Sequence, residues 1–333
     1  MDSSETVADQ YRQFAAEAKD SPCFERWALA LADDAEVLAW VASLPSGKQQ
    51  PNLVFAAARW HGVQAPGPYS GLRGALLEDN GDVRATIMSR STQTNEVGRL
   101  ACLMPVFAQI SSRARHPLAL VEAGASAGLC LFPDRYDYHW SSRGRLTGSG
   151  GATLECVVDG PVPVPASHPV ISWRSGIDVN PLDVADEDAV RWLANLVWPE
   201  QERRRRRLLT AIDVARKTPP QVTRGDLLEK LPEQVDIARK YGEVVVFHSA
   251  VIAYLDLEER AIFQAMMLRL VNDGACHWVS NESKRVLPDI ASSGPTIPNE
   301  LSTFVLGLDG QAVAWTHGHG TSMKWVQADS RVG

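Results

Sequence analysis

The amino-acid sequence predicts an α/β protein in which a helical N-terminal domain precedes a mostly parallel, seven-stranded sheet with a C-terminal antiparallel hairpin. Up to about residue 115, apolar residues recur at spacings of three and four, as on one face of a helix. From residue 117 onward, short apolar runs alternate with helical patterns, which favours parallel strands with helices on both faces. Near the end, Asp309-Gly310 separates two apolar runs, and this dipeptide is a strong hairpin signal.

The N-terminal helical domain is expected to cover residues 1–94. Its second and third helices have recognisable first residues, because Ser21-Pro22 and Asp33-Asp34 each precede an apolar pattern of helical spacing. Polar, glycine- and proline-containing segments at 45–51 and 62–71 are predicted loops.

A longer helix should connect this domain to the sheet. Asn95 can cap a helix that runs from Glu96 to about Arg115, with a kink at Pro105. The helix leads directly into the first strand, so we expect the second domain to cover residues 95–333.

The strands and helices of the second domain follow from the apolar runs and their periodicity. Strands are predicted at 118–122, 170–177, 220–224, 243–248, 275–280, 302–308 and 311–316, and helices at about 186–197, 200–216, 227–240 and 257–272. Residues around 135–165 do not fit this alternation and are expected to form inserted strands, as a flap over the site.

The stretch LVEAGASAGLCLF allows two interpretations. Gly124-Ala125-Ser126-Ala127-Gly128 spells G-x-S-x-G, the nucleophile elbow of α/β-hydrolases. The same residues also describe a glycine turn between a strand and a helix, where a nucleoside cofactor lies against bare backbone. The residues before the turn look helical and Pro133 follows soon after it, so the cofactor loop is favoured over a catalytic Ser126. The dinucleotide pattern G-x-G-x-x-G is absent, which makes NAD a weaker choice.

Polar residues at the ends of the next strands favour a cofactor site. A ligand laid across the carboxyl edge of a parallel sheet meets the end of each strand in turn. Asp178 is placed to accept hydrogen bonds from ribose hydroxyls, and Asp226 to accept one from an adenine amino group. His248 and Ser249 reach the same edge. For each of the two aspartates, a helix cap or turn cap is the alternative.

Composition and net charge indicate which classes of molecule the protein binds. Hydrophobic residues make up 45% and charged residues 22% of the 333 residues, as in an ordinary globular protein. The net charge of −7 argues against a nucleic-acid or membrane surface, so a small-molecule substrate is expected. Five cysteines without a C-x-x-C pair, and no signal-peptide pattern or long apolar run, favour a cytoplasmic location. The oligomeric state is left open.

These motifs together resemble the class I S-adenosylmethionine-dependent methyltransferases over about residues 95–320. The resemblance rests on Glu122-x-Gly124-x-x-x-Gly128, Asp178, Gly225-Asp226, VVVFHSAVIAYL and the terminal hairpin. It implies a Rossmann-like methyltransferase fold and S-adenosylmethionine as cofactor. The segments SRSTQTNEVGR, LVEAGASAGLCLFPDRYDY, GIDVNPLDV and WLANLVWPEQ are similar, over the whole chain, to a bacterial family catalogued as a domain of unknown function. That family usually has Asn at the position of Cys130.

The methyltransferase resemblance also implies roles for individual residues. Glu122 is expected near the methionine part of the cofactor, Gly124, Ala125, Ser126 and Gly128 against it, Asp178 on the ribose, and Asp226 with Leu227 near the adenine.

The polar run before the long helix is a candidate for positioning the substrate. If that helix runs antiparallel to the strand it feeds, its start lies at the carboxyl edge of the sheet. Arg90, Gln93, Asn95 and Glu96 would then approach the glycine loop, although a capped helix start is an equally simple explanation.

For proton transfer, His248 and Glu96 are the candidate bases, with Glu282 as a further alternative. No third ligand accompanies His317 and His319, so no metal site is predicted. The function expected is methyl transfer to a small molecule. A noncatalytic binding or regulatory protein is the alternative, and a serine hydrolase comes third.

Overall fold

The structure is a computed structural model that describes residues 3–93 and 95–327. Its contacts divide the chain into two compact units. Unit 1 consists of the residues up to Gln93 together with Asp186–Leu209, and unit 2 of the remaining residues on either side of that segment. Segment 186–209, expected in the second domain, thus groups with the N-terminal helices. Thr94, at the expected domain boundary, lies outside the described residues.

Unit 1 is helical, and its helices begin at the caps that the sequence indicates. The Ser21 hydroxyl accepts from the Phe24 amide, with Pro22 in the first turn, and Asp34 caps the next helix. Its elements are α1 (Ser3–Glu17), α2 (Pro22–Ala32), α3 (Ala35–Ala42), η1 (Ser46–Lys48), α4 (Pro51–Trp60), α5 (Tyr69–Leu77), α6 (Asp82–Ser89), α8 (Glu187–Leu196) and the first part of α9 (Glu202–Lys217).

The core of unit 1 is aromatic. Phe24 stacks on Trp27 with ring centroids 5.7 Å apart and meets Phe55 edge-on at 5.1 Å. All three side chains are fully buried. Edge-to-face packing of this kind adds a modest attraction to the burial of apolar surface, so these rings hold the N-terminal helices together.

Unit 2 contains the sheet. Its helices and turns are η2 (Val97–Arg99), α7 (Leu100–Arg113), η3 (Leu129–Leu131), η4 (Pro133–Arg135), the end of α9, α10 (Leu227–Ala238), η5 (Ile252–Tyr254), α11 (Leu257–Asn272) and α12 (Pro288–Ser292). Its strands are β1 (Leu118–Ala123), β2 (Asp137–Trp140), β3 (Gly144–Leu146), β4 (Thr153–Asp159), β5 (Ile171–Asp178), β6 (Gln221–Arg224), β7 (Glu243–Ser249), β8 (His277–Ser283), β9 (Phe304–Leu308), β10 (Gln311–Thr316) and β11 (Ser322–Trp325).

The five strands predicted as parallel are parallel, in the order β6-β5-β1-β7-β8. From β1 the chain moves outward through β5 and β6, then crosses back to β7 on the other side of β1. The order therefore reverses between β1 and β7. In open α/β sheets, ligands bind beyond the carboxyl ends of the strands at such a switch point.

The predicted seven-stranded methyltransferase-like sheet is wrong, because the sheet has eleven strands in the order β3-β2-β4-β11-β10-β9-β8-β7-β1-β5-β6. The hairpin of β9 and β10 forms at Asp309-Gly310 as predicted, but it does not end the sheet. β9 is antiparallel to β8, and β10 pairs onward with β11. β11 in turn pairs with β4 in parallel, so the predicted inserted strands extend the sheet.

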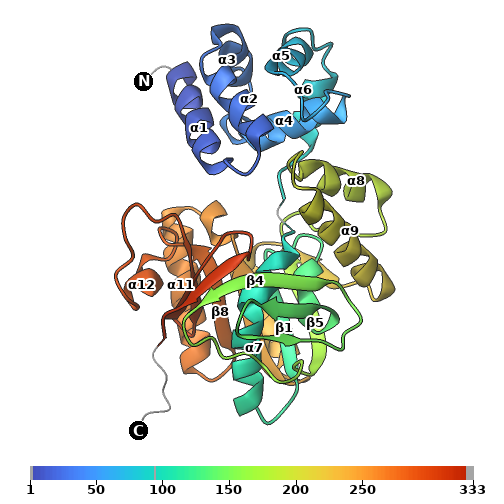
Figure 1. Cartoon of the computed structure of the whole chain (residues 1–333). Coiled ribbons are helices and arrows are strands. Elements are labelled where there is room, and N and C mark those ends of the chain that lie inside the picture. Colours follow the sequence, from blue (N-terminus) through green and yellow to red (C-terminus); the bar gives the residue numbers. More distant parts are fainter. Residues whose placement is uncertain (1–2, 94, 328–333) are drawn as a thin grey trace. The chain divides into compact units, whose positions relative to one another are not determined.

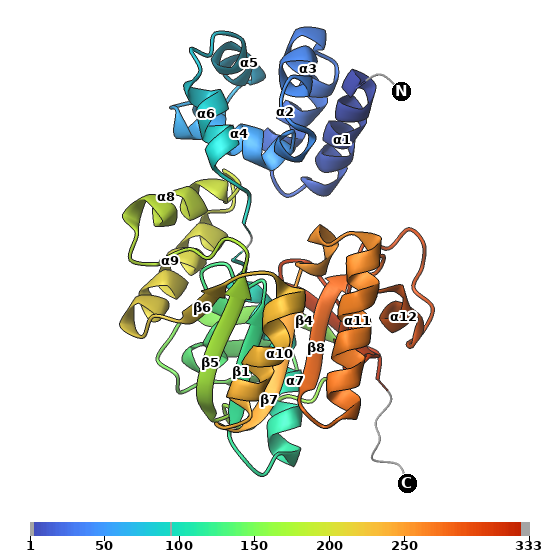
Figure 2. The same cartoon turned by 180° about the vertical axis from the view of Figure 1, so that it is seen from behind.

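Helices cover both faces of the parallel strands. α10 and α11 lie over β1, β7 and β8 in Figure 2, where Val121, Val246 and Trp278 pack in a common apolar core. α7 lies on the opposite face, where Phe107 meets Phe247 at 5.3 Å. The same helix also contacts β2 and β4, and the Trp140 Nε1–H donates to the Ala101 carbonyl at 2.7 Å. The sheet thus curls around α7, with β4 crossing in front of the parallel strands in Figure 1.

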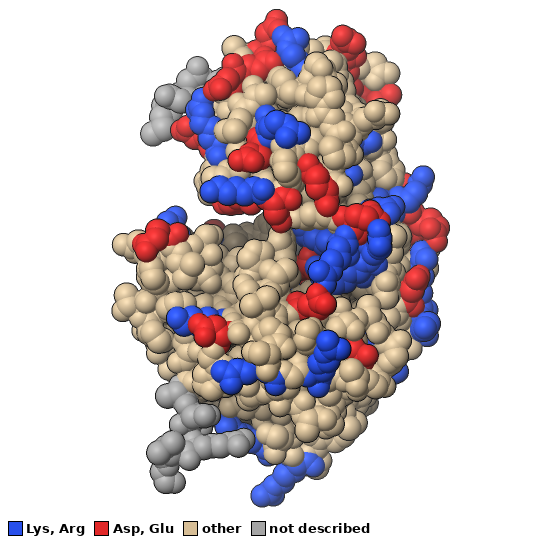
Figure 3. Space-filling view, in the orientation of Figure 1, with Lys and Arg blue, Asp and Glu red and all other residues tan. Residues whose placement is uncertain are grey.

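Acidic and basic side chains both occur on the face shown in Figure 3, and a group of basic side chains gathers over α9, which contains the run Arg203–Arg207. In unit 1 the exposed side chains of Arg12 and Asp33 form an ion pair at 2.9 Å. No helix in the described part of the chain has the length and apolar character needed to cross a membrane.

The tip of the β9–β10 hairpin is fixed to β8 by Asp309. Its carboxylate accepts from the Trp278 amide at 2.7 Å and bonds the His277 ring at 2.8 Å. The hydrogen bond to Asp309 raises the pKa of His277. Burial of the ring opposes this increase, and the negative charge of Glu243 adds to it. The stabilisation is therefore fully present below about pH 6.5, the ordinary pKa of histidine, and is lost as pH rises through the raised value.

We predict that Asp309→Asn lowers the melting temperature more at about pH 5.5 than at about pH 9. Thermal unfolding followed by circular dichroism at the two pH values measures the difference. In a His277→Gln background the effect of Asp309→Asn should no longer depend on pH. An equal or larger loss at high pH in the otherwise native chain would contradict the assignment.

Candidate functional site

The loop after β1 turns sharply and is stabilised from within. Gly124, Ser126 and Gly128 all have positive φ, of 71°, 51° and 66°. Every amide N–H from 124 to 128 donates to an acceptor within unit 2, four of them outside the loop and one within it. The acceptors are the Ile177 carbonyl for Gly124 and Ala125, Asp178 Oδ2 for Ser126, Asn95 Oδ1 for Ala127 and the Ala125 carbonyl for Gly128. The loop therefore offers no spare amide for the anionic group of a ligand.

Other residues of the protein occupy the space beside the glycines of this loop. A Cβ on Gly124 would lie 2.4 Å from the Val251 side chain, and one on Gly128 would lie 2.7 Å from Pro220. The loop also leads into the 3-10 turns η3 and η4, where a helix was expected. The strand-loop-helix geometry on which both sequence interpretations relied is therefore absent.

Ser126 is held as a hydrogen-bond acceptor. Asn95 Nδ2 donates to its Oγ at 2.7 Å, and the side chain is almost completely buried. A nucleophile elbow needs a histidine within hydrogen-bond reach of the serine and a helix after it. Among the described residues, no histidine is hydrogen-bonded to Ser126. This geometry does not support a catalytic serine.

The sequence predicted Asn95 as the cap of the long helix, and this prediction is wrong. Glu96 takes that place, because its Oε1 accepts from the Gly98 amide at 2.9 Å and η2 precedes α7. Asn95 is thereby free to donate to Ser126 and to accept from Ala127, at 3.1 Å. It lies against the glycine loop, where a substrate-positioning residue was predicted, but its amide group serves the loop.

Asp178 is the fixed acid of this edge. Its Oδ2 accepts from the Ser126 amide and its Oδ1 from the Asn180 amide, both at 2.7 Å. The side chain is half-buried at the end of β5. A carboxylate has about four lone-pair positions, so each oxygen retains an acceptor site after these two bonds.

Glu122 is the buried acid of this edge. It is 8% exposed, and its Oε2 has no hydrogen-bond partner among the described residues. Burial, reinforced by the negative charge of Asp178, raises the pKa of Glu122 well above its usual range, and Arg99 opposes this shift. The shift favours the protonated form of Glu122, and a cation placed beside the carboxyl group would favour the ionised form.

Polar residues that the sequence did not indicate as functional lie on the same face of the sheet as Glu122. Arg99 donates to the Ser249 carbonyl at 2.9 Å and to the Gly318 carbonyl at 2.7 Å. Asn281 bonds the Ser249 hydroxyl and accepts from Thr316. A charged residue within an apolar segment, such as Arg99 at the start of α7, indicates a buried polar contact. The sequence alone does not show which residue it contacts.

Strand alternation places His248 on the opposite face from Glu122. Glu122 is level with Phe247 in the register of β1 and β7, and Phe247 faces α7. The next residue, His248, therefore points under α11, where it is fully buried and meets Phe263. Trp278 Nε1 donates to His248 Nε2 at 3.0 Å, so His248 Nδ1 donates to Glu282 at 2.7 Å. Both ring nitrogens are thus occupied.

Glu282 is positioned by the same core network. Its Oε1 also accepts from the amides of Val251 and Ile252, at 3.0 and 3.2 Å. His248 and Glu282 thereby tie β7, β8 and η5 together. Neither side chain lies on the face of Glu122, although the sequence analysis grouped all three at one edge.

The remaining predicted residues have local roles in the structure. Asp226 caps α10 by accepting from the Leu228 amide at 2.7 Å, and Leu227, the first residue of α10, is buried in the apolar core. Glu96 is buried, with Oε2 3.8 Å from His319 Nδ1. Within the described residues, no group of three or more His, Cys, Asp or Glu side chains is arranged to hold a metal ion.

Arg90 and Gln93 belong to unit 1. Arg90 bonds Asp188 at 2.5 Å, and its guanidinium lies 4.6 Å from the Trp60 ring and 5.0 Å from the Trp192 ring. Stacking of this kind fixes a guanidinium in place. Of the four predicted positioning residues, the structure brings Asn95 and Glu96 to the glycine loop.

The close approach of Gly124 to Val251 can be tested against a glycine with the same backbone demand. We predict that Gly124→Ala lowers the free energy of unfolding by about 2–4 kcal/mol, because a left-handed backbone and a steric clash both oppose the new Cβ. Gly274 has φ of 65° and nothing within 4 Å of a Cβ, so Gly274→Ala should cost only about 1–2 kcal/mol. Urea denaturation measures both changes.

A second change isolates the clash. In the Gly124→Ala background, Val251→Ala should cost less than it does alone, because it removes the atoms that the new methyl group meets. Additive losses, or equal losses for Gly124→Ala and Gly274→Ala, would show that Val251 does not limit this position.

Comparison with known proteins gives one match. No curated protein and no solved structure matches the chain. Residues 8–325 match a family described as "Uncharacterized protein conserved in bacteria (DUF2332)". The match covers nearly the whole sequence, including both units, so the chain belongs to this bacterial family of domains of unknown function.

Proposed function

We propose that unit 2 binds S-adenosylmethionine at the carboxyl edge of β1 and β5 and transfers its methyl group to a small molecule. The observation that supports this most directly is the Asp178 carboxylate. It stands at the end of the strand next to the switch point, fixed by two backbone amides and still able to accept. A ribose diol presents two donors to such a carboxylate.

Glu122 fits the amino-acid part of this ligand. Its buried Oε2 lacks a partner among the described residues, on the face of the sheet that also holds Arg99. An ammonium group beside Glu122 would favour the ionised carboxylate, which burial alone disfavours. Binding of the cation is therefore expected to release the proton from Glu122.

When bound, S-adenosylmethionine supplies an electrophilic methyl group, and transfer to an acceptor is an in-line displacement. The protein's contribution is then alignment and exclusion of water, and a base is needed only for an acceptor that carries a proton at the reacting atom. His248 is engaged on both nitrogens in the core, so we do not assign it as that base. Glu96, beside His319, stays the candidate base.

The engagement of His248 favours one alternative, in which the same site binds the nucleoside without catalysing transfer. The two functions share their ligand and differ in product. Binding of S-adenosylmethionine without formation of S-adenosylhomocysteine, across a panel of thiol, amine and carboxylate acceptors, would favour this alternative.

The first prediction is binding itself. Calorimetric titration with S-adenosylmethionine and with S-adenosylhomocysteine should each give micromolar affinity, about −8 kcal/mol. The titrations should be repeated at several temperatures, because binding enthalpy can cross zero. No heat with either compound at any temperature would exclude the proposed ligand.

The second prediction concerns the ribose. Adenosine should bind about 10- to 100-fold more tightly than 2′,3′-dideoxyadenosine, since a hydrogen bond to a charged group contributes roughly 1.5–3 kcal/mol. Asp178→Asn should reduce that ratio. Asp226→Asn is the matched control at the next strand end and should leave the ratio unchanged.

The ratio of the two nucleoside affinities separates ribose binding from loop stability, because Asp178 also supports the loop. A general loss of structure in Asp178→Asn would weaken both ligands alike and preserve the ratio. The assignment of the ribose to Asp178 is wrong if the native protein binds both nucleosides equally, or if the variant keeps the discrimination.

The third prediction follows from the raised pKa of Glu122. Binding of S-adenosylmethionine should tighten as pH rises through that pKa, with release of a proton. Titration in buffers of different ionisation enthalpy counts the protons released. Glu122→Gln should abolish the release, whereas Glu282→Gln, a buried acid on the opposite face, should retain it. Unchanged proton release in Glu122→Gln would contradict the assignment.

A further inference from the structure

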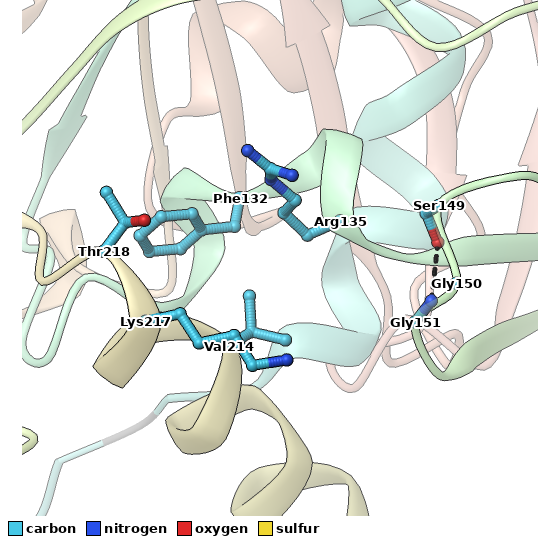
Figure 4. Close-up of a pocket in the computed structure, with 8 residues that line it drawn as sticks. All are labelled: Phe132, Arg135, Ser149, Gly150, Gly151, Val214, Lys217 and Thr218. Atoms are coloured by element: carbon cyan, nitrogen blue, oxygen red, sulfur yellow. Dashed lines mark hydrogen bonds between the residues drawn. The ribbon is translucent and has the colours of Figure 1, made fainter.

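A cavity in unit 2 is lined by other residues than those of the site at β1. It encloses about 190 Å³ and is lined by three segments (Figure 4). Phe132 lies between η3 and η4, and Arg135 is the last residue of η4. Residues 149–151 come from the loop between β3 and β4. Val214 and Lys217 come from the last turn of α9, and Thr218 follows it directly. In Figure 4 the two cationic side chains lie on either side of the Phe132 ring.

The cavity has an excess of positive charge. The nearest acid to Arg135 is Asp134, at 3.4 Å, but both oxygens of Asp134 also accept from Arg174 at 2.7 Å. Lys217 has no carboxylate within salt-bridge distance among the described residues. The lining residues thus include two cations and no acid, while Asp134 and Asp137 contact the lining residues from behind.

The loop of residues 149–151, on the third side of the cavity, adds a backbone donor. Ser149 Oγ donates to Asp137 at 2.7 Å and accepts from the Gly151 amide at 3.0 Å, as the dashed line in Figure 4 marks. These bonds fix the loop. The Gly150 amide, between them, makes no hydrogen bond with any described residue.

The wall of the cavity is apolar. Phe132 is 2% exposed, with the Arg174 guanidinium 5.3 Å from its ring, and Val214 lies beside it. The volume corresponds to roughly six water molecules at about 30 Å³ each, which is below the range of about 300–1,000 Å³ for drug-sized ligands. The space therefore suits a small molecule with one apolar side and one charged group.

We propose that this cavity binds a small organic anion, a phosphate monoester or a carboxylate, with its charge between Arg135 and Lys217 and its apolar part against Phe132. Opposite charges in a partly enclosed pocket attract more strongly than in bulk water. This ligand site is separate from the proposed nucleoside site and does not depend on that proposal.

The test uses the full chain and four probes in calorimetric titrations at low salt: inorganic phosphate, phenyl phosphate, benzoate and phenol. Phenyl phosphate or benzoate should bind more tightly than phenol, and the tighter of the two anions identifies the charged group. Binding should weaken with added salt, because salt screens exposed charges. Equal binding of phenol, or no binding of either organic anion at millimolar concentration, would overturn the proposal.

Variants place the ligand. Lys217→Gln and Arg135→Gln should each weaken the better anion by about fivefold to tenfold, less than for a fully buried charge pair. Lys240→Gln is the matched control, since it removes an exposed cation that does not line the cavity. Equal weakening by all three variants would show a general effect of net charge and overturn the site. The substituted side chains are exposed, and circular dichroism confirms that each variant is folded.

Discussion

The candidate site depends on the carboxylate of Asp178. By accepting from the Ser126 and Asn180 amides, it ties the loop after β1 to the end of β5. Positive φ at Ser126 is costly for a residue with a side chain, and a charge-assisted hydrogen bond offsets that cost. The same bonds hold the carboxylate in one orientation, so the interaction that stabilises the loop also orients the acceptor to which we assign the ribose in the proposed function.

The two faces of the sheet divide the polar residues of this edge. On the α7 face lie Glu122 and Arg99, close to the loop that Asn95 and Asp178 support. On the α11 face, His248 and Glu282 form a closed network within the core. Because successive residues of a strand point to opposite faces, two neighbouring residues at one strand end serve different purposes. The proposed ligand site thus lies on one face, and a hydrogen-bond network that stabilises the core lies on the other.

Local patterns in the sequence predicted the local structure well. The parallel strands, the hairpin at Asp309-Gly310 and the caps at Ser21 and Asp34 all follow from periodicity or turn chemistry within a few residues. The eleven-stranded sheet did not follow, because β11 is a short strand of four residues whose partner β4 lies far away in the sequence. Likewise, an all-buried strand such as β7 shows no alternation, so the face occupied by His248 is defined only by its neighbours.

A crystal structure of the protein grown with S-adenosylhomocysteine tests the central claim most directly. The account predicts electron density for the nucleoside beyond the ends of β1 and β5, with the ribose hydroxyls within hydrogen-bond distance, about 2.5–3.0 Å, of Asp178. Density for the ligand elsewhere, with Asp178 bonded only to the Ser126 and Asn180 amides, would contradict it. In that event Asp178 would be a structural residue of the β1 loop alone.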